Sequence, residues 1–485
     1  MERLSALDAE FLHLEDGAAH MHIGGACVFR GPPPSIGEFE SLIAAKLHSI
    51  PRYRQRVRTV PLELGRPVWA DDPHFDLGSH IHRAALPAPG DDALFRQLMG
   101  RLMSQPLDRN SPLWELWLVE GLEGGRWALV CKVHHCMVDG IAGVGLLTIV
   151  LDLAAGTAVG EPEPWAPRPE PSGTAKVLDA WDGLISGSAA LARQGASSLV
   201  HPLDAARSAV ETAGGALHLL AHLVPTRRLS IEGPIGPHRV WTHSKADLAD
   251  VTAVRRAFGG TVNDVVLAAV AGGYRRLLLE HGDDADRAVL RSLVPVSTRH
   301  DDGQGIPDNR LSALIYELPV SVTDPLERLE MVQRELAALK AAHLTDAGEV
   351  AAEAGDFVPP VVLGGLTRCV VRSMHRFGQQ SLNTVTTNVP GPGFPLYCLG
   401  REMLAYLPFV PISHGFRVGT AALSYNGQLF FGVTGDESVP DVDVVATEAA
   451  AGVEVLRELA VARLGDRSTP LVPRGTGPQN ARSAG

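Results

Sequence analysis

The residues of this chain best suited to chemistry lie close together, in the stretch 127–145 (WALVCKVHHCMVDGIAGVG). Two adjacent histidines, His134 and His135, follow an apolar run with the length and composition of a buried strand. Cys136 comes next, and Asp139 stands four residues after the second histidine. Because imidazole titrates near neutral pH, it can take a proton from an attacking group and return it later. The stretch therefore indicates general acid–base catalysis.

The two histidines are not expected to do the same work. Adjacent residues of a regular strand point to opposite faces, so His134 and His135 cannot both face one cavity. We predict that His135 is the general base. We predict that His134 is a supporting core histidine with its hydrogen bonds satisfied.

The polar residues around the pair allow other interpretations. Asp139 precedes a glycine and an apolar helix, so it fits an N-cap or a carboxylate that holds an arginine and braces the loop. Cys136 could be a nucleophile beside a histidine, but a buried, inert cysteine is commoner. The histidines and Asp139 could also bind a metal. Metal sites usually need three or four converging ligands, and this spacing matches no zinc signature, so we predict no metal.

The elements that must position these residues divide the chain into two halves. A proline-rich stretch, GEPEPWAPRPEPSG, cannot hold a helix or a central strand and indicates a linker or crossover. The expected parts are an N-terminal half at 1–159, the linker at 160–173, a C-terminal half at 174–467 and a disordered tail at 468–485.

Periodicity predicts a mixed α and β fold in both halves. The expected helices are 37–49, 92–104, 141–154, 248–258, 265–280, 326–343 and 442–459. The expected strands include parts of 17–30, and also 114–119, 127–131, 240–242, 291–296, 311–320, 383–389, 417–424 and 430–434. The basic cluster at 51–56 is interpreted as a solvated helix end. Helices in 174–224 are expected to pack on the protein itself, with contact to a membrane surface as the alternative.

Composition excludes several classes of protein. A hydrophobic content of 45% and a charged content of 20% describe a globular chain, and a net charge of −12 opposes binding to nucleic acid. Five cysteines without a CxxC pair fit a reducing compartment. We find no secretory signal and no apolar run of membrane-spanning length, so we expect a cytoplasmic protein, either soluble or peripherally attached.

The stretch HHCMVDG, residues 134–140, resembles the HHxxxDG motif of the CoA-dependent acyltransferase superfamily. Over residues 4–460 the chain is similar to bacterial wax ester synthase/diacylglycerol acyltransferases. The blocks that carry this similarity are LSALDA (4–9), MHIGG (21–25), PLD (106–108), PLWE (112–115), ND (263–264), VPVS (294–297), NVPGP (388–392) and SYNG (424–427). Two departures are Thr387, where the family usually has serine, and Asp308, where glycine is more usual.

The resemblance implies an α/β (α+β) fold of two domains, like chloramphenicol acetyltransferase, with a cleft between the halves. It implies transfer of a fatty acyl group from acyl-CoA to a hydroxyl, with His135 as general base and His134 as support. Asp139 would brace the loop, with Arg299 as its suggested partner. Asn263, at the start of a predicted helix, would donate to the oxyanion; an ordinary N-cap is the alternative.

The partners implied are acyl-CoA as co-substrate, with no other cofactor, and a lipid acceptor. The acceptor would be diacylglycerol, giving triacylglycerol, or a long-chain alcohol, giving a wax ester. Peripheral contact with the inner face of the membrane or with lipid inclusions would follow. Two alternatives stay open: an acyltransferase that uses a carrier-protein- or polyketide-bound donor, and a catalytically silent lipid-droplet surface protein. Acyl-chain length, the preferred acceptor and the oligomeric state are not determined by the sequence.

Overall fold

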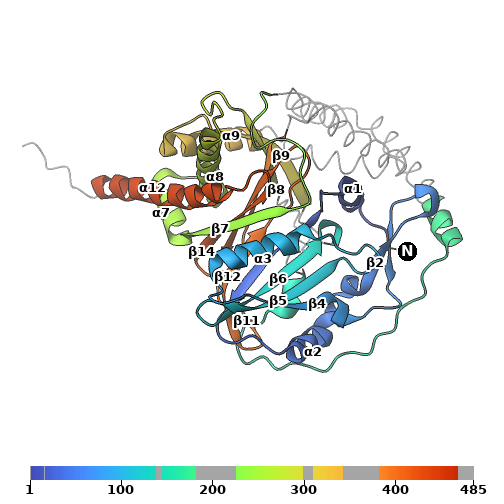
Figure 1. The fold of residues 1–485 in the computed structure, drawn as a ribbon. Helices are drawn as coiled ribbons and strands as arrows, with labels where there is room; N and C mark the ends of the chain where they lie inside the picture. The colour runs from blue at the N-terminus through green and yellow to red at the C-terminus, as the bar shows by residue number, and fades with distance from the viewer. Residues whose placement is uncertain are drawn as a thin grey trace, which may run out of the picture.

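The computed structural model describes residues 2–15, 17–137, 145–181, 226–298, 310–341 and 382–467. Two six-stranded sheets organise this part of the chain, each with its own hydrophobic core (Figure 1). Mixed helices and strands in two halves confirm the predicted fold class. The cleft between the halves stays a prediction.

The first sheet has the strand order β11-β12-β1-β6-β5-β4. Its strands are β1 (His22–Phe29), β4 (Ile81–Ala85), β5 (Trp114–Leu122), β6 (Arg126–His134), β11 (Tyr397–Cys398) and β12 (Arg401–Phe409). Its helices are α1 (Ala6–Leu14), α2 (Ile36–Lys46), α3 (Asp92–Ser104) and α4 (Gly145–Val150). A small sheet pairs β2 (Gln55–Arg58) with β3 (Val68–Asp71), and short 3-10 helices include η2 (Pro51–Arg54), η3 (Pro61–Glu63) and η5 (His135–Met137).

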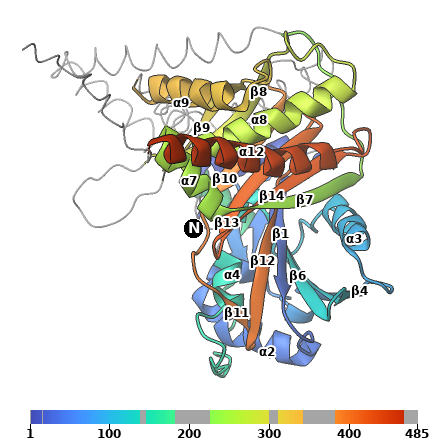
Figure 2. The same cartoon turned by 90° about the vertical axis from the view of Figure 1, so that its left-hand side faces the viewer.

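The second sheet has the order β7-β14-β13-β10-β8-β9. Its strands are β7 (Arg239–Asp247), β8 (Leu290–Thr298), β9 (Arg310–Leu318), β10 (Thr384–Val389), β13 (Val418–Tyr425) and β14 (Gln428–Asp436). Its helices are α7 (Leu248–Phe258), α8 (Val262–Glu280), α9 (Pro325–Ala341) and α12 (Asp443–Arg467). Figure 2 shows α8, α9 and α12 layered over this sheet. The apolar run of α8 is buried beneath α12, as a helix between two layers requires.

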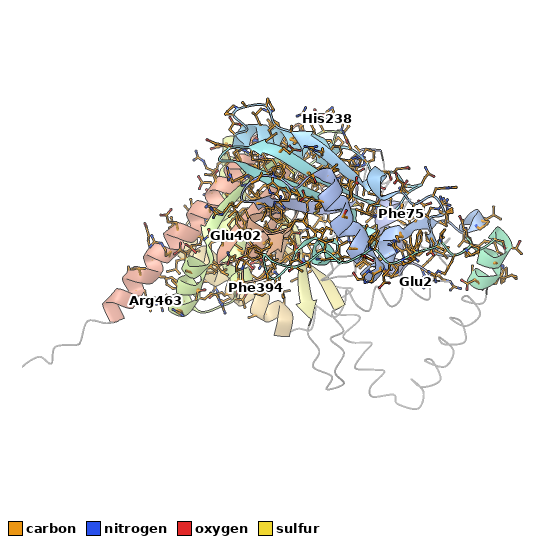
Figure 3. The ribbon with its side chains drawn as sticks, turned by 90° about the horizontal axis from the view of Figure 1, so that it is seen from below. Glu2, Phe75, His238, Phe394, Glu402 and Arg463 are labelled. Carbon is orange, nitrogen blue, oxygen red and sulfur yellow. The ribbon has the colours of Figure 1, made fainter. Side chains whose placement is uncertain are left out.

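Helix α12 extends beyond the body of the molecule at its C-terminal end (Figure 1). Figure 3 shows Arg463 near that projecting end, and Glu2 and Phe75 at the opposite side. The guanidinium of Arg463 lies 5.0 Å from the ring centroid of Phe258, the last residue of α7. This cation–π contact holds the projecting turns against the helix below.

Helix α3 joins the two halves directly. Its cap begins at Asp91, whose side chain accepts from the Leu94 N–H at 2.9 Å. At the other end, the hydroxyl of Ser104 accepts from the backbone N–H of Arg239 at 2.8 Å. Arg239 begins β7 of the second sheet, so the sheets are fixed to one another through the helix that covers the first.

The predicted second half also supplies part of the first sheet. Strands β11 and β12 lie within 397–409, yet β12 pairs antiparallel with β1. At the end of β12, the Pro408 carbonyl accepts from the Trp241 indole N–H at 3.1 Å. A Cβ on Gly432 would lie 1.9 Å from that same carbonyl oxygen, so only glycine allows β14 to approach. The division of the chain by residue number is therefore not the division between sheets.

The proline-rich stretch contains no helix or strand over 160–172 and runs along the first half (Figure 1). Arg168 donates to both carboxylate oxygens of Asp71, at 3.1 and 3.2 Å. Trp165 lies under the guanidinium of Arg54, 5.1 Å away. Arg56 donates to Glu170 at 3.1 Å. The interpretation of 51–56 as a solvated helix end was therefore wrong, because these arginines bind the crossover.

Most expected helices and strands are confirmed, several with their bounds. Helices α3 and α7 match 92–104 and 248–258. The Asn426-Gly427 turn is confirmed, with both residues at positive φ, as a tight hairpin requires. The helix expected at 141–154 ends at Val150, because Asp152 forms a β-bridge with Tyr397. Residues 173–181 are helical, while the rest of 174–224 and the tail 468–485 lie outside the described residues.

Candidate active site

The histidine pair lies where β6 ends. His134 is the last residue of the strand and pairs with His22 of β1, and His135 opens the 3-10 turn η5. The strand before them is buried from Trp127 onward, as its apolar sequence predicts. Because the backbone changes from strand to turn between the two histidines, their rings lie in different environments.

His135 is tightly held. Its backbone N–H donates to the Met21 carbonyl at 2.8 Å, and its ring stacks on Phe11 with centroids 3.8 Å apart. Its Nδ1 is buried without a hydrogen-bond partner among the described residues. Burial lowers the pKa of His135 to about 4, because the charged imidazolium loses its hydration. The ring is therefore neutral at pH 7, the form that accepts a proton.

His134 is a core residue with a defined tautomer. It is 1% exposed, and its Nδ1 accepts from the Cys136 backbone N–H at 3.1 Å. A neutral imidazole has one donor and one acceptor nitrogen, so the proton resides on Nε2. That atom lies 3.6 Å from a carboxylate oxygen of Glu15, an electrostatic pairing longer than a hydrogen bond. The core position is confirmed, but the expectation of satisfied hydrogen bonds was wrong for Nε2, which has no hydrogen-bond partner among the described residues. The supporting role stays a prediction.

Glu15 is ionised at this site. Although burial by itself would raise its pKa, His134 and Arg109 lower the pKa of Glu15 to about 2. The Arg109 Nε donates to Glu15 at 2.8 Å, and the Met21 backbone N–H donates to its other oxygen at 3.3 Å. The negative charge of Glu15 is therefore stabilised by His134, Arg109 and the Met21 N–H.

The structure does not test the predicted brace of the histidine loop. Asp139 and its suggested partner Arg299 lie outside the described residues, so the brace stays a prediction.

Cys136 is 2% exposed, and burial raises the pKa of its thiol well above the usual range. A thiol that stays protonated is a poor nucleophile. The geometry supports a passive Cys136.

Asn263 is not an N-cap, so that alternative was wrong. The cap of α8 is Thr261, whose side chain accepts from the Asp264 N–H at 3.2 Å while Asp264 accepts from the Thr261 N–H at 2.7 Å. Asn263 lies inside the first turn, where its side-chain oxygen accepts from the Asn388 amide at 3.4 Å. Two blocks far apart in sequence therefore meet. Within the described ranges, no hydrogen bond joins Asn263 to His135.

Sequence reasoning missed Phe11 and Glu15, which contact the histidine pair, and Arg109, which pairs with Glu15. Phe11 lies in α1, a helix that was not predicted, and Glu15 is the C-cap of that helix. A signal for it exists, because Ser5 caps the helix and Asp8 stands at the third helical position. Trp114, by contrast, packs as expected, with its indole N–H donating to the Tyr53 carbonyl at 2.8 Å.

Among the described residues, no group of three or more His, Cys, Asp or Glu side chains could hold a metal ion. No described helix combines the length and the apolar character needed to cross a bilayer.

Comparisons with known proteins give one consistent result. The family model "Wax ester synthase/diacylglycerol acyltransferase catalytic domain" matches residues 4–266, and "WS/DGAT C-terminal domain" matches 308–457. A Mycobacterium tuberculosis protein named "Probable diacyglycerol O-acyltransferase" is 37% identical over 473 residues, with 96% of each chain covered.

Solved structures have the same fold. A wax ester synthase/diacylglycerol acyltransferase from Marinobacter aquaeolei aligns with a TM-score of 0.66 at 24% identity, covering 95% of this chain and 100% of that one. The first condensation domain of the CDA synthetase aligns with a TM-score of 0.56 at 16% identity, covering 95% of each chain. The chain therefore belongs to the wax ester synthase/diacylglycerol acyltransferase family and is an acyltransferase of that family.

Proposed function

We propose that this acyltransferase moves a fatty acyl group from acyl-CoA to the hydroxyl of diacylglycerol or of a long-chain alcohol, with His135 as general base. The observation that supports the base most directly is the environment of its ring. Phe11 covers one side, burial keeps the imidazole neutral, and the Met21 carbonyl fixes its backbone.

The proton balance follows from this assignment. His135 takes the hydroxyl proton while the alcohol oxygen attacks the thioester carbonyl, and a tetrahedral intermediate forms. When that intermediate collapses, the C–S bond breaks and His135 returns the proton to the CoA sulfur. Full deprotonation of an alcohol with a pKa of about 16 would cost about 12 kcal/mol at pH 7, so proton transfer and attack must be concerted.

The oxyanion of the intermediate needs a hydrogen-bond donor. We propose Asn263 for that role, because its bond to Asn388 uses the side-chain oxygen and leaves the amide as donor. The positive end of α8 adds to the field there. Asn263→Ala should lower kcat by about 10²–10³-fold with KM little changed, the usual effect of losing such a donor.

A brace between Asp139 and Arg299 stays part of the proposal. Arg299→Ala should then lower both activity and melting temperature. If neither quantity changes, the pairing is abandoned while the assignment of His135 stands.

One assay tests the proposed function. Purified protein is given palmitoyl-CoA with either diacylglycerol or hexadecanol, and release of CoA is followed for the wild type and His135→Ala. We expect release with at least one acceptor and a loss of at least about 100-fold in the variant. Circular dichroism checks that the variant is folded.

The outcomes separate the alternatives. No CoA release with either acceptor, together with transfer from an acyl-loaded carrier protein, would favour a carrier-bound donor. No transfer from any donor would favour a silent surface protein. Equal rates in wild type and His135→Ala would contradict the assignment of the base.

We also propose that the enzyme works at a lipid surface, since its acceptors are lipids. The helical residues 173–181 expose Leu178 and Trp181, at 65% and 56%. The segment 61–65 packs on that helix, since Gly65 closely approaches Ala180, and its Leu62 is 86% exposed. Flotation with vesicles containing diacylglycerol tests the contact. Leu178→Ser with Trp181→Ser should reduce the bound fraction, and unchanged binding would contradict it.

A further inference from the structure

Glu15, a carboxylate that the proposed reaction does not use, contacts both His134 and Met21. Glu15 follows the last residue of α1, and its side chain is 12% exposed. Its Oε2 lies 3.6 Å from His134 Nε2, and its Oε1 accepts from the Met21 N–H at 3.3 Å. Arg109 donates to the same carboxylate at 2.8 Å. Glu15 therefore connects α1, the segment before β1 and the end of β6.

Two of the residues that Glu15 contacts, Met21 and His134, also hold the backbone at His135 and Cys136. Met21 accepts from the His135 backbone N–H at 2.8 Å. His134 accepts, through Nδ1, from the N–H of Cys136 at 3.1 Å. One hydrogen bond fixes His135 itself, and the other fixes the residue after it. The backbone of the proposed base is therefore set by two bonds whose partners both touch Glu15.

The tautomer of His134 explains why the negative charge of Glu15 matters, and not only its packing. The Cys136 N–H requires an unprotonated Nδ1, so the ring must keep its proton on Nε2. A carboxylate facing Nε2 stabilises that tautomer, as second-layer carboxylates do for histidines elsewhere. Without it, the Nδ1–H tautomer becomes accessible. The Cys136 N–H would then lose its acceptor, and the turn that presents His135 would relax.

We infer that Glu15 is a positioning residue for His135, acting through His134 and Met21 and not on the substrate. This inference rests on the proposed function, because it needs His135 as the base. It assigns a purpose to the Glu15–Arg109 pair, in which the arginine holds the carboxylate toward the histidine.

The first test is Glu15→Gln, which keeps the size of the side chain and an acceptor for Met21 but removes the charge. We expect kcat with palmitoyl-CoA to fall about tenfold while KM changes less than twofold. Glu10→Gln is the matched control. It removes a carboxylate from α1, the helix that Glu15 follows. That carboxylate pairs with His13 at 3.6 Å, and its loss should leave kcat unchanged.

A double-mutant cycle separates positioning from general loss of structure. In a His134→Gln background, Glu15→Gln should change kcat less than twofold, because its partner is already gone. The same tenfold loss in both backgrounds, or a fully active Glu15→Gln, would overturn the inference. Melting temperatures of all variants are measured alongside.

A second measurement needs no variant of Glu15. In wild-type enzyme with ¹⁵N-labelled histidine, the neutral His134 ring should show its proton on Nε2, its signals being assigned by their loss in His134→Gln. A proton on Nδ1 would overturn the inference. If His135→Ala is active, the proposed role of His135 as base is wrong. If His135→Ala is inactive but Glu15→Gln is fully active, only the role of Glu15 is wrong.

Discussion

The ring of Phe11 lies against the imidazole of His135, with centroids 3.8 Å apart and planes inclined by 23°. Phe11 belongs to α1, whose residues come more than a hundred positions before the histidine. The aromatic face keeps water from one side of the base and limits its rotation. The helix α1 is thus part of the proposed active site.

Phe11→Leu should weaken both effects. Water reaching the ring would raise the pKa of His135 toward its usual value, and a looser ring would lower kcat by about three- to tenfold. Rates of CoA release and their dependence on pH measure the change. Leu7→Ala, at a half-exposed position of the same helix, is the control, and an equal loss there would point to damage of α1 as a whole.

The pH dependence of kcat/KM should reflect the surroundings of His135, the proposed base. Because burial lowers the pKa of His135 to about 4, its neutral form predominates above that value and is lost as the pH falls through it. We expect kcat/KM to be flat from about pH 5.5 to 8, with an acid limb well below 6.5. A midpoint near 6.5 would mean that the base is solvated.

Glu232 should make the enzyme less stable at alkaline pH. It is 2% exposed, and burial raises its pKa to about 7. A raised carboxyl pKa contributes stability below about pH 4.5, and this contribution is lost as the pH rises through 7. Glu232→Gln should therefore raise the free energy of unfolding at pH 8, on the order of 1–3 kcal/mol, but not at pH 4.5. Urea unfolding at both pH values checks this.

The crossover should be anchored by Asp71. Its pKa is about 2, because the opposing effect of burial is outweighed by hydrogen bonds from Arg168 and Gln55. A lowered carboxyl pKa contributes stability above about pH 3.8 that is lost only as the pH falls through 2. Asp71→Asn should cost about 1 kcal/mol, equally at pH 7 and pH 5. A cost that disappears by pH 5 would show another group to be responsible.

Gly432→Ala should damage the junction of the sheets. A Cβ there would lie 1.9 Å from the Pro408 carbonyl oxygen, and backbone atoms cannot give way cheaply. We expect a loss of about 3 kcal/mol or more in the free energy of unfolding. Gly156→Ala is the matched control, since its Cβ would meet nothing within 4 Å. Similar melting temperatures for both variants would contradict the packing argument.

The sequence predicted the local elements well, and their assembly less well. Periodicity located α3 and α7 because each presents an apolar stripe to a core. It could not locate β12, whose residues only partly alternate in burial, nor show that this strand pairs with β1. Pairing between strands that are distant in sequence depends on the tertiary packing of the whole protein, which a short stretch of sequence does not show.

The same limit applies to the site. The adjacent histidines pointed to a base because their residue types are rare and chemically specific. Glu15 and Arg109 gave no such signal, since their charges look like those of any exposed surface. Only the fold shows that Glu15 faces His134 and that Arg109 binds Glu15. Asn263 was expected just before a helix at 265–280, but it lies in the first turn of α8, whose cap is Thr261.

The place of β12 in the first sheet constrains the order in which the molecule can be made. Until residue 409 has left the ribosome, β1 has a vacant edge whose N–H and C=O groups lack their partners. Strand β6, which carries the histidine pair and lies next to β1, therefore remains in an incomplete sheet until β12 has been made. A fragment ending at the proline-rich crossover would retain that open edge permanently, and a chaperone that shields it would favour correct assembly.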